Sequence, residues 1–290
     1  MLGCHGQTPA PSADGAPVVK YSPDQIRRGA YVAAIAGCTT CHTPLMPDGK
    51  LHDHSRELGG GNLLPLPDGT VAYAPNISAD RITGIGAWSD LQILGAIREG
   101  IAPAGHRLAP IMPYAYYNRM TDEDATALVA YLRTQPPIAN RIPHVHHHGV
   151  RPVAVAASRH YVDRDGDSIA HGEYLATLMH CGACHTPDAG PAAHQPFAGG
   201  TRFREVVAPN ITSDLETGIG SWHEGDIAEA VRGMKDRDDQ PLRAPMADYA
   251  EAWSKLTESD ARALAAYIAS LPPVVHDVNR EQAPPQSARR

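Results

Sequence analysis

Apolar side chains recur at helical spacing in several segments, and polar residues suited to helix caps stand at their starts. The polar cap residues and the helical spacing of the apolar residues predict a helix over residues 23–37. Ser89 and Gln92 have the spacing of a capping box, and Gly100 predicts the end of the helix that they begin. No segment alternates like a strand of any length. The pattern therefore predicts an all-α fold.

The predicted apolar faces recur along the chain. Leu91, Leu94 and Ile97 mark one face of the helix that follows Ser89. Two later helices begin at Thr residues followed three positions on by Asp, and they carry matching stripes: Leu128, Tyr131 and Leu132 after Thr121, and Leu264, Tyr267 and Ile268 after Thr257. Because glycine permits close helix crossings, we expect the tyrosines of these stripes to pack on Gly29 and Gly172.

Long segments appear twice, in the same order. "APNISADRITGIGAW" at 74–88 matches "APNITSDLETGIGSW" at 208–222, and "TDEDATALVAYL" at 121–132 matches "TESDARALAAYI" at 257–268. The repeat predicts two duplicated domains. The expected division is a flexible tether over 1–21, domains over 22–140 and 165–275, a linker over 141–164 and a tail over 276–290.

Length and charge limit the choice of function. A chain of 290 residues suits two domains of moderate size. The formal charge of −7 argues against nucleic acid and favours a basic surface on any protein partner. No stretch approaches the roughly 18 apolar residues of a membrane helix.

The strongest chemical signal is "CTTCHTP" at 38–44 and "CGACHTP" at 181–187. C-x-x-C-H is the attachment signal of c-type haem, in which two thiols form thioethers and the histidine ligates iron. The repeat predicts two haem c groups per chain, held by Cys38, Cys41 and His42 and by Cys181, Cys184 and His185. The alternatives are a redox dithiol and a zinc site made of four cysteine ligands.

Four of the five cysteines belong to these motifs, which leaves Cys4. "LGC" resembles the end of a bacterial lipoprotein signal, and the Pro/Ala/Gly/Ser run behind it suits a tether. The prediction is a lipidated Cys4, and the alternative is an idle thiol. Since haem attachment of this kind takes place outside the cytoplasm, we expect the periplasm or the outer face of the cytoplasmic membrane.

The repeat also selects a second axial ligand for each iron. Trp88 precedes Met112 by the same distance that separates Trp222 from Met246. A thioether opposite imidazole raises the reduction potential and closes the iron to substrates. Both methionines are predicted iron ligands, with a role as core filler as the alternative.

The order of helix, C-x-x-C-H, "APNI", "TGIG", late methionine and final helix with tyrosine resembles class I cytochrome c domains. It is most similar to the cytochrome c subunits of bacterial membrane-bound alcohol, aldehyde and gluconate dehydrogenases. The resemblance covers about 22–140 and 165–275, although those subunits usually carry three haems. It implies two domains, each wrapped around one covalently bound haem c.

The resemblance also suggests groups that meet the haem propionates. Buried propionates need donors, which Asn76, Asn210 and the indole N–H groups of Trp88 and Trp222 can supply. The alternative for both tryptophans is ordinary core packing. Arg98 and Arg232 occupy equivalent positions, where propionate pairing and a solvated helix face are both open.

These features predict a di-haem electron carrier and no catalytic activity of its own. It would take electrons from a dehydrogenase or quinol-oxidising partner and pass them to a downstream cytochrome or terminal oxidase. A di-haem peroxidase, a thiolate-ligated sulfur-oxidising enzyme and a purely structural subunit are the alternatives. The run from His144 to His148 is predicted to be solvated linker, with zinc or copper binding as the alternative.

Overall fold

The computed structural model describes residues 21–49, 51–66, 71–143, 168–190, 192–203 and 206–278. The predicted tether with Cys4, the run from His144 to His148, nearly all of the predicted linker and most of the tail lie outside the described residues. Predictions about those segments stay predictions.

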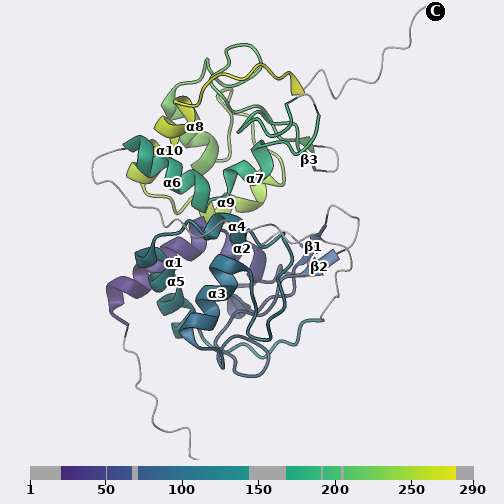
Figure 1. Ribbon diagram of the computed structural model, residues 1–290, viewed down its shortest axis with the longest axis vertical. Coiled ribbons are helices and arrows are strands. Elements are labelled where there is room, and N and C mark those ends of the chain that lie inside the picture. The colour runs from purple at the N-terminus through teal and green to yellow at the C-terminus, as the bar shows by residue number, and fades with distance from the viewer. Residues whose placement is uncertain are drawn as a thin grey trace, which may run out of the picture.

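The described part of the chain is mostly helical, and its two halves carry similar successions of elements that differ in their short 3-10 helices (Figure 1). The first half consists of α1 (Pro23–Ile35), α2 (Cys38–His42), the 3-10 helix η1 (His54–Arg56), β1 (Leu63–Pro65), β2 (Val71–Tyr73), α3 (Asp90–Glu99), α4 (Tyr114–Tyr117) and α5 (Asp122–Thr134). The second half consists of α6 (Ser168–Leu178), α7 (Cys181–His185), β3 (Arg202–Phe203), β4 (Val206–Val207), α8 (Glu224–Arg232), the 3-10 helix η2 (Met246–Tyr249), α9 (Ala250–Trp253) and α10 (Glu258–Ala269).

The caps that the sequence predicts are present. Ser89 and Gln92 form a full capping box at the start of α3, and Gly100 ends that helix with a left-handed φ of 65°. The hydroxyl groups of Thr121 and Thr257 accept the backbone N–H three residues on, at the starts of α5 and α10. Each cap satisfies a backbone donor that the first helical turn leaves unpaired.

Close helix crossings hold each half together. Helix α1 packs on α5, and α6 packs on α10. A Cβ atom added to Gly29 would lie 1.9 Å from the carbonyl oxygen of Ala127, and one added to Gly172 would lie 2.0 Å from that of Ala263. The predicted packing of Tyr131 against Gly29 and of Tyr267 against Gly172 is confirmed.

The mostly helical fold agrees with the prediction in its main features, and two details differ. Each half contains a small antiparallel ladder, in which β1 pairs with β2 and β3 with β4. Strands of two or three residues are too short to show an alternating pattern in the sequence. The face predicted for α3 is also shifted, because Leu91 is 80% exposed while Ile93, Ala96 and Ile97 are the buried side chains.

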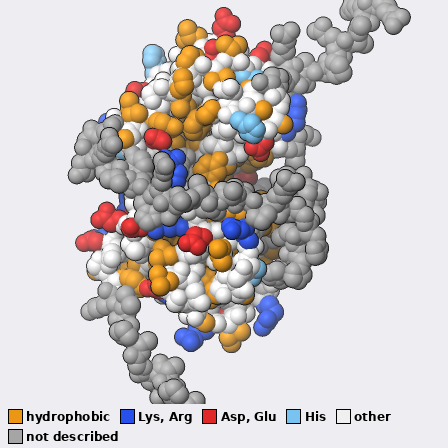
Figure 2. Space-filling view, viewed as in Figure 1, with side chains coloured by type: hydrophobic (Ala, Val, Ile, Leu, Met, Phe, Trp, Pro, Cys, Tyr) orange, Lys and Arg blue, Asp and Glu red, His pale blue; other side chains and the backbone are white. Residues whose placement is uncertain are grey.

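The two halves share one core. Buried apolar side chains of both form a single cluster that includes Val32 and Leu128 from the first half and Leu175 and Trp253 from the second. Figure 1 shows α2 and α4 of the first half and α9 of the second at the seam between them. On the face in Figure 2, hydrophobic side chains gather over the second half. No helix within the described ranges is long and apolar enough to cross a bilayer.

Reciprocal polar contacts cross the seam. The Tyr174 hydroxyl donates to Asp124 Oδ2 at 2.6 Å, and the repeat-equivalent Tyr31 hydroxyl donates to Asp260. Asp124 also receives the guanidinium of Arg28, with N–O distances of 2.6 and 2.8 Å. The two tyrosine–aspartate bonds therefore tie each half to the other in the same way.

Candidate haem-binding sites

Each C-x-x-C-H motif forms a helical turn of its own. The motif helices α2 and α7 begin after residues in the left-handed region, Gly37 with φ 77° and His180 with φ 47°. These residues break the chain away from α1 and α6, so the motif does not continue the preceding helix. The predicted helix over 23–37 is confirmed except that it ends at Ile35 and is separated from the motif by this turn.

The motif histidines are oriented alike. His42 Nδ1 lies 2.7 Å from the carbonyl oxygen of Pro75, and His185 Nδ1 lies 2.9 Å from that of Pro209. A carbonyl only accepts, so each Nδ1 carries the proton and the lone pair falls on Nε2. Burial lowers the pKa of both histidines, which keeps the rings neutral. A neutral imidazole held by its other nitrogen is the form that ligates a metal.

Burial disfavours the thiolate form of the motif cysteines. Burial raises the pKa of Cys38 to about 12 and that of Cys41 to about 11. Burial likewise raises the pKa of Cys181 to about 12 and raises that of Cys184. A redox dithiol or a zinc ligand needs a thiolate, and none of the described residues form a group of three or more His, Cys, Asp or Glu placed to hold a metal ion. Because a bound metal would itself deprotonate its thiol ligands, the raised pKa values do not bear on a zinc site; what speaks against one is the separation of the ligand groups within the described residues.

Met112 and Met246 lie at equivalent places, just before α4 and at the start of η2. Both are partly buried and pack against the shared core. Their role as axial ligands stays a prediction.

The side-chain amides of Asn76 and Asn210 make hydrogen bonds within the protein, and their propionate role stays a prediction. The side-chain amide of Asn76 donates to the carbonyl of Ile138 at 2.6 Å, and that of Asn210 donates to the carbonyl of Val274 at 2.8 Å. Each amide also donates to the threonine of the following "TGIG" segment, Thr83 or Thr217. These bonds use the amide hydrogens to fasten the segment after the last helix, so they favour a structural role over propionate binding.

Trp88 and Trp222 are partly buried at the edge of the core. Their propionate role stays a prediction. Arg98 is engaged within the protein, where it donates to Asp122 at 2.7 Å and to the carbonyl of Met120 at 2.6 Å. These contacts favour neither the propionate pairing nor the solvated helix face, and they tie the end of α3 to the start of α5.

Asn62 is a site residue that the sequence did not reveal. Its side-chain amide donates to the carbonyls of Thr43, Cys41 and Thr40 at 2.7, 3.0 and 3.3 Å, and its oxygen accepts the N–H of Leu45 at 3.0 Å. One side chain thus fastens the carboxyl end of the first motif. The second half has Thr201 at this position, and a hydroxyl cannot make this set of bonds.

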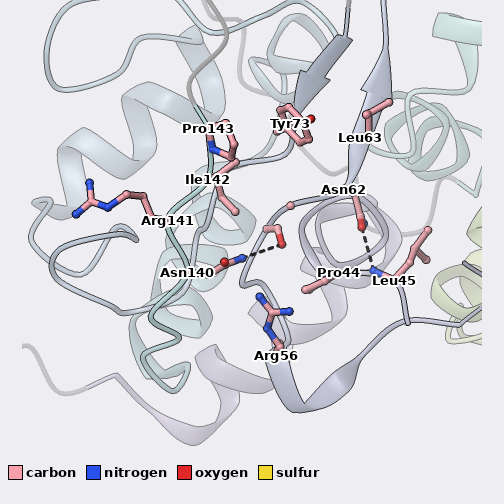
Figure 3. A pocket seen from close by; sticks show the side chains of 12 residues that line it. Pro44, Leu45, Arg56, Asn62, Leu63, Tyr73, Asn140, Arg141, Ile142 and Pro143 are labelled. Carbon is pink, nitrogen blue, oxygen red and sulfur yellow. Dashed lines mark hydrogen bonds between the residues drawn. The ribbon is translucent and has the colours of Figure 1, made fainter. Parts of the chain in front are cut away.

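A cleft of about 430 Å³ lies beside this residue on the first half. It runs between the β1–β2 ladder and residues 140–143. Figure 3 shows the bond that the Leu45 N–H donates to Asn62 and the bond that the Asn140 amide donates to the Gly60 carbonyl. Arg56 points among the lining side chains, while Arg141 extends away. The cleft thus presents a cationic side chain at the surface near the first motif.

Taken together, the residues of both motifs fit haem c. Each half offers two free cysteines and one histidine whose Nδ1 is held by a backbone carbonyl. Haem c supplies one-electron chemistry at its iron when it is bound in this way. The chain supplies the attachment points and the fixed orientation of the ligand.

Comparison with known proteins agrees with this geometry. A model of the cytochrome c family matches residues 26–136 and 169–272. The chain is 35% identical over 288 residues to the cytochrome c subunit of a quinone-type alcohol dehydrogenase from Gluconacetobacter polyoxogenes, an alignment that covers 86% of this chain and 56% of that subunit. It is 32% identical over 271 residues to the fructose dehydrogenase cytochrome subunit of Gluconobacter japonicus, covering 85% and 52%.

A shorter relative is similar over most of its length. The diheme c-type cytochrome of Cereibacter sphaeroides is 31% identical over 264 residues, which is 85% of this chain and 86% of that protein. By contrast, this chain spans little more than half of the alcohol and fructose dehydrogenase subunits. The match of the family model to both halves, together with these relatives, shows that the chain belongs to the cytochrome c family.

Proposed function

We propose that the chain is a di-haem c-type cytochrome that carries electrons and has no catalytic activity of its own. The observation that supports this most directly is the repeated pairing of a C-x-x-C-H turn with a backbone carbonyl at histidine Nδ1. A single such site would suit many haem proteins. Two equivalent sites in one shared core suit transfer through the molecule from one partner to another.

In this proposal His42 and His185 hold one face of each iron, and Met112 and Met246 hold the other. Two strong ligands leave no open position for a substrate, which is the condition for a carrier. Cys38, Cys41, Cys181 and Cys184 fix each ring covalently. Trp88 and Trp222 are the donors proposed for the propionate edges.

The partners are proposed from the relatives. Two of the relatives named above are cytochrome subunits of alcohol and fructose dehydrogenases, so the donor proposed here is a dehydrogenase or quinol-oxidising protein. The acceptor is a downstream cytochrome or a terminal oxidase. The proposed place is the periplasm or the outer face of the cytoplasmic membrane, with a tether through lipidated Cys4.

Haem counting and ligand binding test the proposal. Pyridine haemochrome analysis of the denatured protein should give two covalently bound haems, because thioethers survive unfolding. The reduced wild-type protein should not bind carbon monoxide appreciably at neutral pH. Met112→Ala and Met246→Ala should each make one haem reactive, while Met46→Ala, which removes a methionine that is 43% exposed, should not.

Two results would contradict the proposal. One haem per chain, or none, would remove the di-haem assignment. A wild-type protein with a high-spin haem that binds carbon monoxide and consumes peroxide would replace the carrier with a peroxidase.

A further inference from the structure

Tyr249 of the second half lies against the entry to both motifs. A Cβ atom added to Gly37, the residue before Cys38, would lie 2.8 Å from Tyr249 Cε1. The ring of His180, the residue before Cys181, meets the Tyr249 ring edge to face, with centroids 5.6 Å apart and planes at 65°. One aromatic side chain therefore contacts the residues that open both haem-attachment turns.

Two further aromatic side chains complete this group. Trp253 stacks on Tyr249 with centroids 4.5 Å apart and planes at 19°. Its indole N–H donates across the seam to the carbonyl of Ile35 at 3.0 Å. Tyr117 of the first half meets His180 at 6.3 Å and donates its hydroxyl proton to the carbonyl of Ala36. We call Tyr117, His180, Tyr249 and Trp253 the aromatic bridge.

Three of the four bridge side chains are buried, and two of them donate to carbonyls at the end of α1. Tyr117, His180 and Trp253 are between 3% and 9% exposed. Tyr249 is partly buried, and its ring contacts Gly37 before the first motif and His180 before the second. The bridge thus occupies the space between the two attachment sites.

A reciprocal contact lies on the other side of the seam. A Cβ atom added to Gly182, inside the second motif, would lie 3.5 Å from the hydroxyl oxygen of Tyr116. Tyr116 belongs to α4, which follows the segment of Met112, and Tyr249 belongs to η2, which begins at Met246. In both halves the helix at the candidate methionine therefore touches the motif of the other half.

We propose that the aromatic bridge is the structural link that sets electron exchange between the two haem sites, with Tyr249 as its central positioning residue. The proposal rests on the di-haem function proposed above. Electron transfer through protein falls steeply with distance and is favoured by closely packed, bonded paths. The bridge supplies such a path, and it also fixes the separation of the two motifs.

The test uses Tyr249→Leu in the full-length holoprotein, a change that keeps bulk but removes the ring. After rapid photochemical reduction of a fraction of the haems, the rate of redistribution between the two haems is followed by absorbance. We expect the rate to fall about tenfold or more, because small misplacements of reacting groups have effects of that order. Tyr249→Phe should restore the rate, and Tyr73→Leu, which removes a partly buried tyrosine outside the bridge, should leave it unchanged.

Haem counting on the same samples separates the two proposals. Two haems with an unaltered rate in Tyr249→Leu would overturn the bridge and leave the di-haem assignment intact. A wild-type redistribution rate that rises with protein concentration would also overturn it, because exchange through the bridge is intramolecular. The concentration dependence is measured on the wild-type protein, so it tests the proposal even if a variant does not fold.

Discussion

At the scale of single residues, both motif histidines are fixed by the same device. The Nδ1–H groups of His42 and His185 donate to the carbonyl oxygens of Pro75 and Pro209, with N–O distances of 2.7 and 2.9 Å. A hydrogen bond at the other ring nitrogen orients a metal-ligating histidine and makes it a stronger ligand, so the bonded partner affects metal binding as well. Since both partners are backbone atoms, no side-chain substitution can remove them directly.

The two motifs differ in how their ends are fastened, which gives a prediction for Asn62. Asn62→Ala removes three bonds to the carbonyls of residues 40, 41 and 43 and should lower the free energy of unfolding by about 1–3 kcal/mol, the usual cost of unpaired buried polar groups. Urea unfolding followed by circular dichroism measures the change.

Thr201→Ala is the matched control in the second half. The Thr201 hydroxyl is buried without a hydrogen-bond partner among the described residues, so its removal should be neutral or slightly stabilising. Equal losses in both variants would show that Asn62 contributes packing and not its hydrogen bonds.

Sequence reasoning reached the motif residues because their chemistry depends on neighbours in the chain. Cys38, Cys41 and His42 are recognisable from spacing alone. Asn62 was missed because it acts on carbonyl groups about 20 residues earlier, and nothing in its own surroundings marks it. The bond from Asn76 to the Ile138 carbonyl was missed for a similar reason, because Ile138 lies 62 residues later, beyond the last helix of the half.

At the scale of elements, the crossing of α1 with α5 depends on Gly29. A Cβ atom there would lie 1.9 Å from the carbonyl oxygen of Ala127, far inside contact distance, so the helices would have to separate. Gly29→Ala should therefore destabilise the protein by about 1–3 kcal/mol or more through overpacking. The urea midpoint of the holoprotein measures the loss.

Gly225 in α8 provides the control for this prediction. Nothing lies within 4 Å of a Cβ atom added there. Gly225→Ala should raise stability by about 0.5–1 kcal/mol, because alanine loses less backbone entropy in a helix. A Gly29→Ala protein as stable as wild type would mean that the crossing tolerates a wider separation than the structure shows.

Helix starts were predictable for a reason that also explains the errors. Caps such as Ser89 with Gln92 bond within one turn, so they are written in adjacent residues. Which face of α3 is buried depends on the elements packed against it, and Leu91 is exposed although it lies at helical spacing with Ile97. The short β ladders left no periodic signal.

At the scale of the whole molecule, the halves are joined by contacts that the repeat alone does not reveal. Tyr31 reaches Asp260, and Tyr174 reaches Asp124, across sequence distances of 229 and 50 residues. The flanking partners differ, since Arg28 pairs with Asp124 whereas His171 Nε2 lies 2.9 Å from Asp260 Oδ1. Both halves therefore keep the tyrosine–aspartate contact, while the basic residue beside the aspartate differs, Arg28 in one half and His171 in the other.

Ionisation of Tyr31 and Tyr174 should weaken the contact between the halves at high pH. Burial, together with the neighbouring Asp260 and Asp124, raises the pKa of Tyr31 and Tyr174 above the ordinary value of 10. A raised pKa means that the stability from both groups is fully present below about pH 10 and is lost as the pH rises toward their folded values. The double variant Tyr31→Phe with Tyr174→Phe should cost about 1.5–3 kcal/mol per bond at neutral pH. Because phenylalanine does not ionise, the urea midpoint of the double variant should fall less than that of wild type between about pH 9 and about pH 11.

The comparison with wild type cancels the effect of the other buried tyrosines, which both proteins contain. Tyr73→Phe controls for the loss of a hydroxyl group outside the seam. Parallel midpoint curves for wild type and the double variant would show that the crossed tyrosine–aspartate pairs do not hold the halves together.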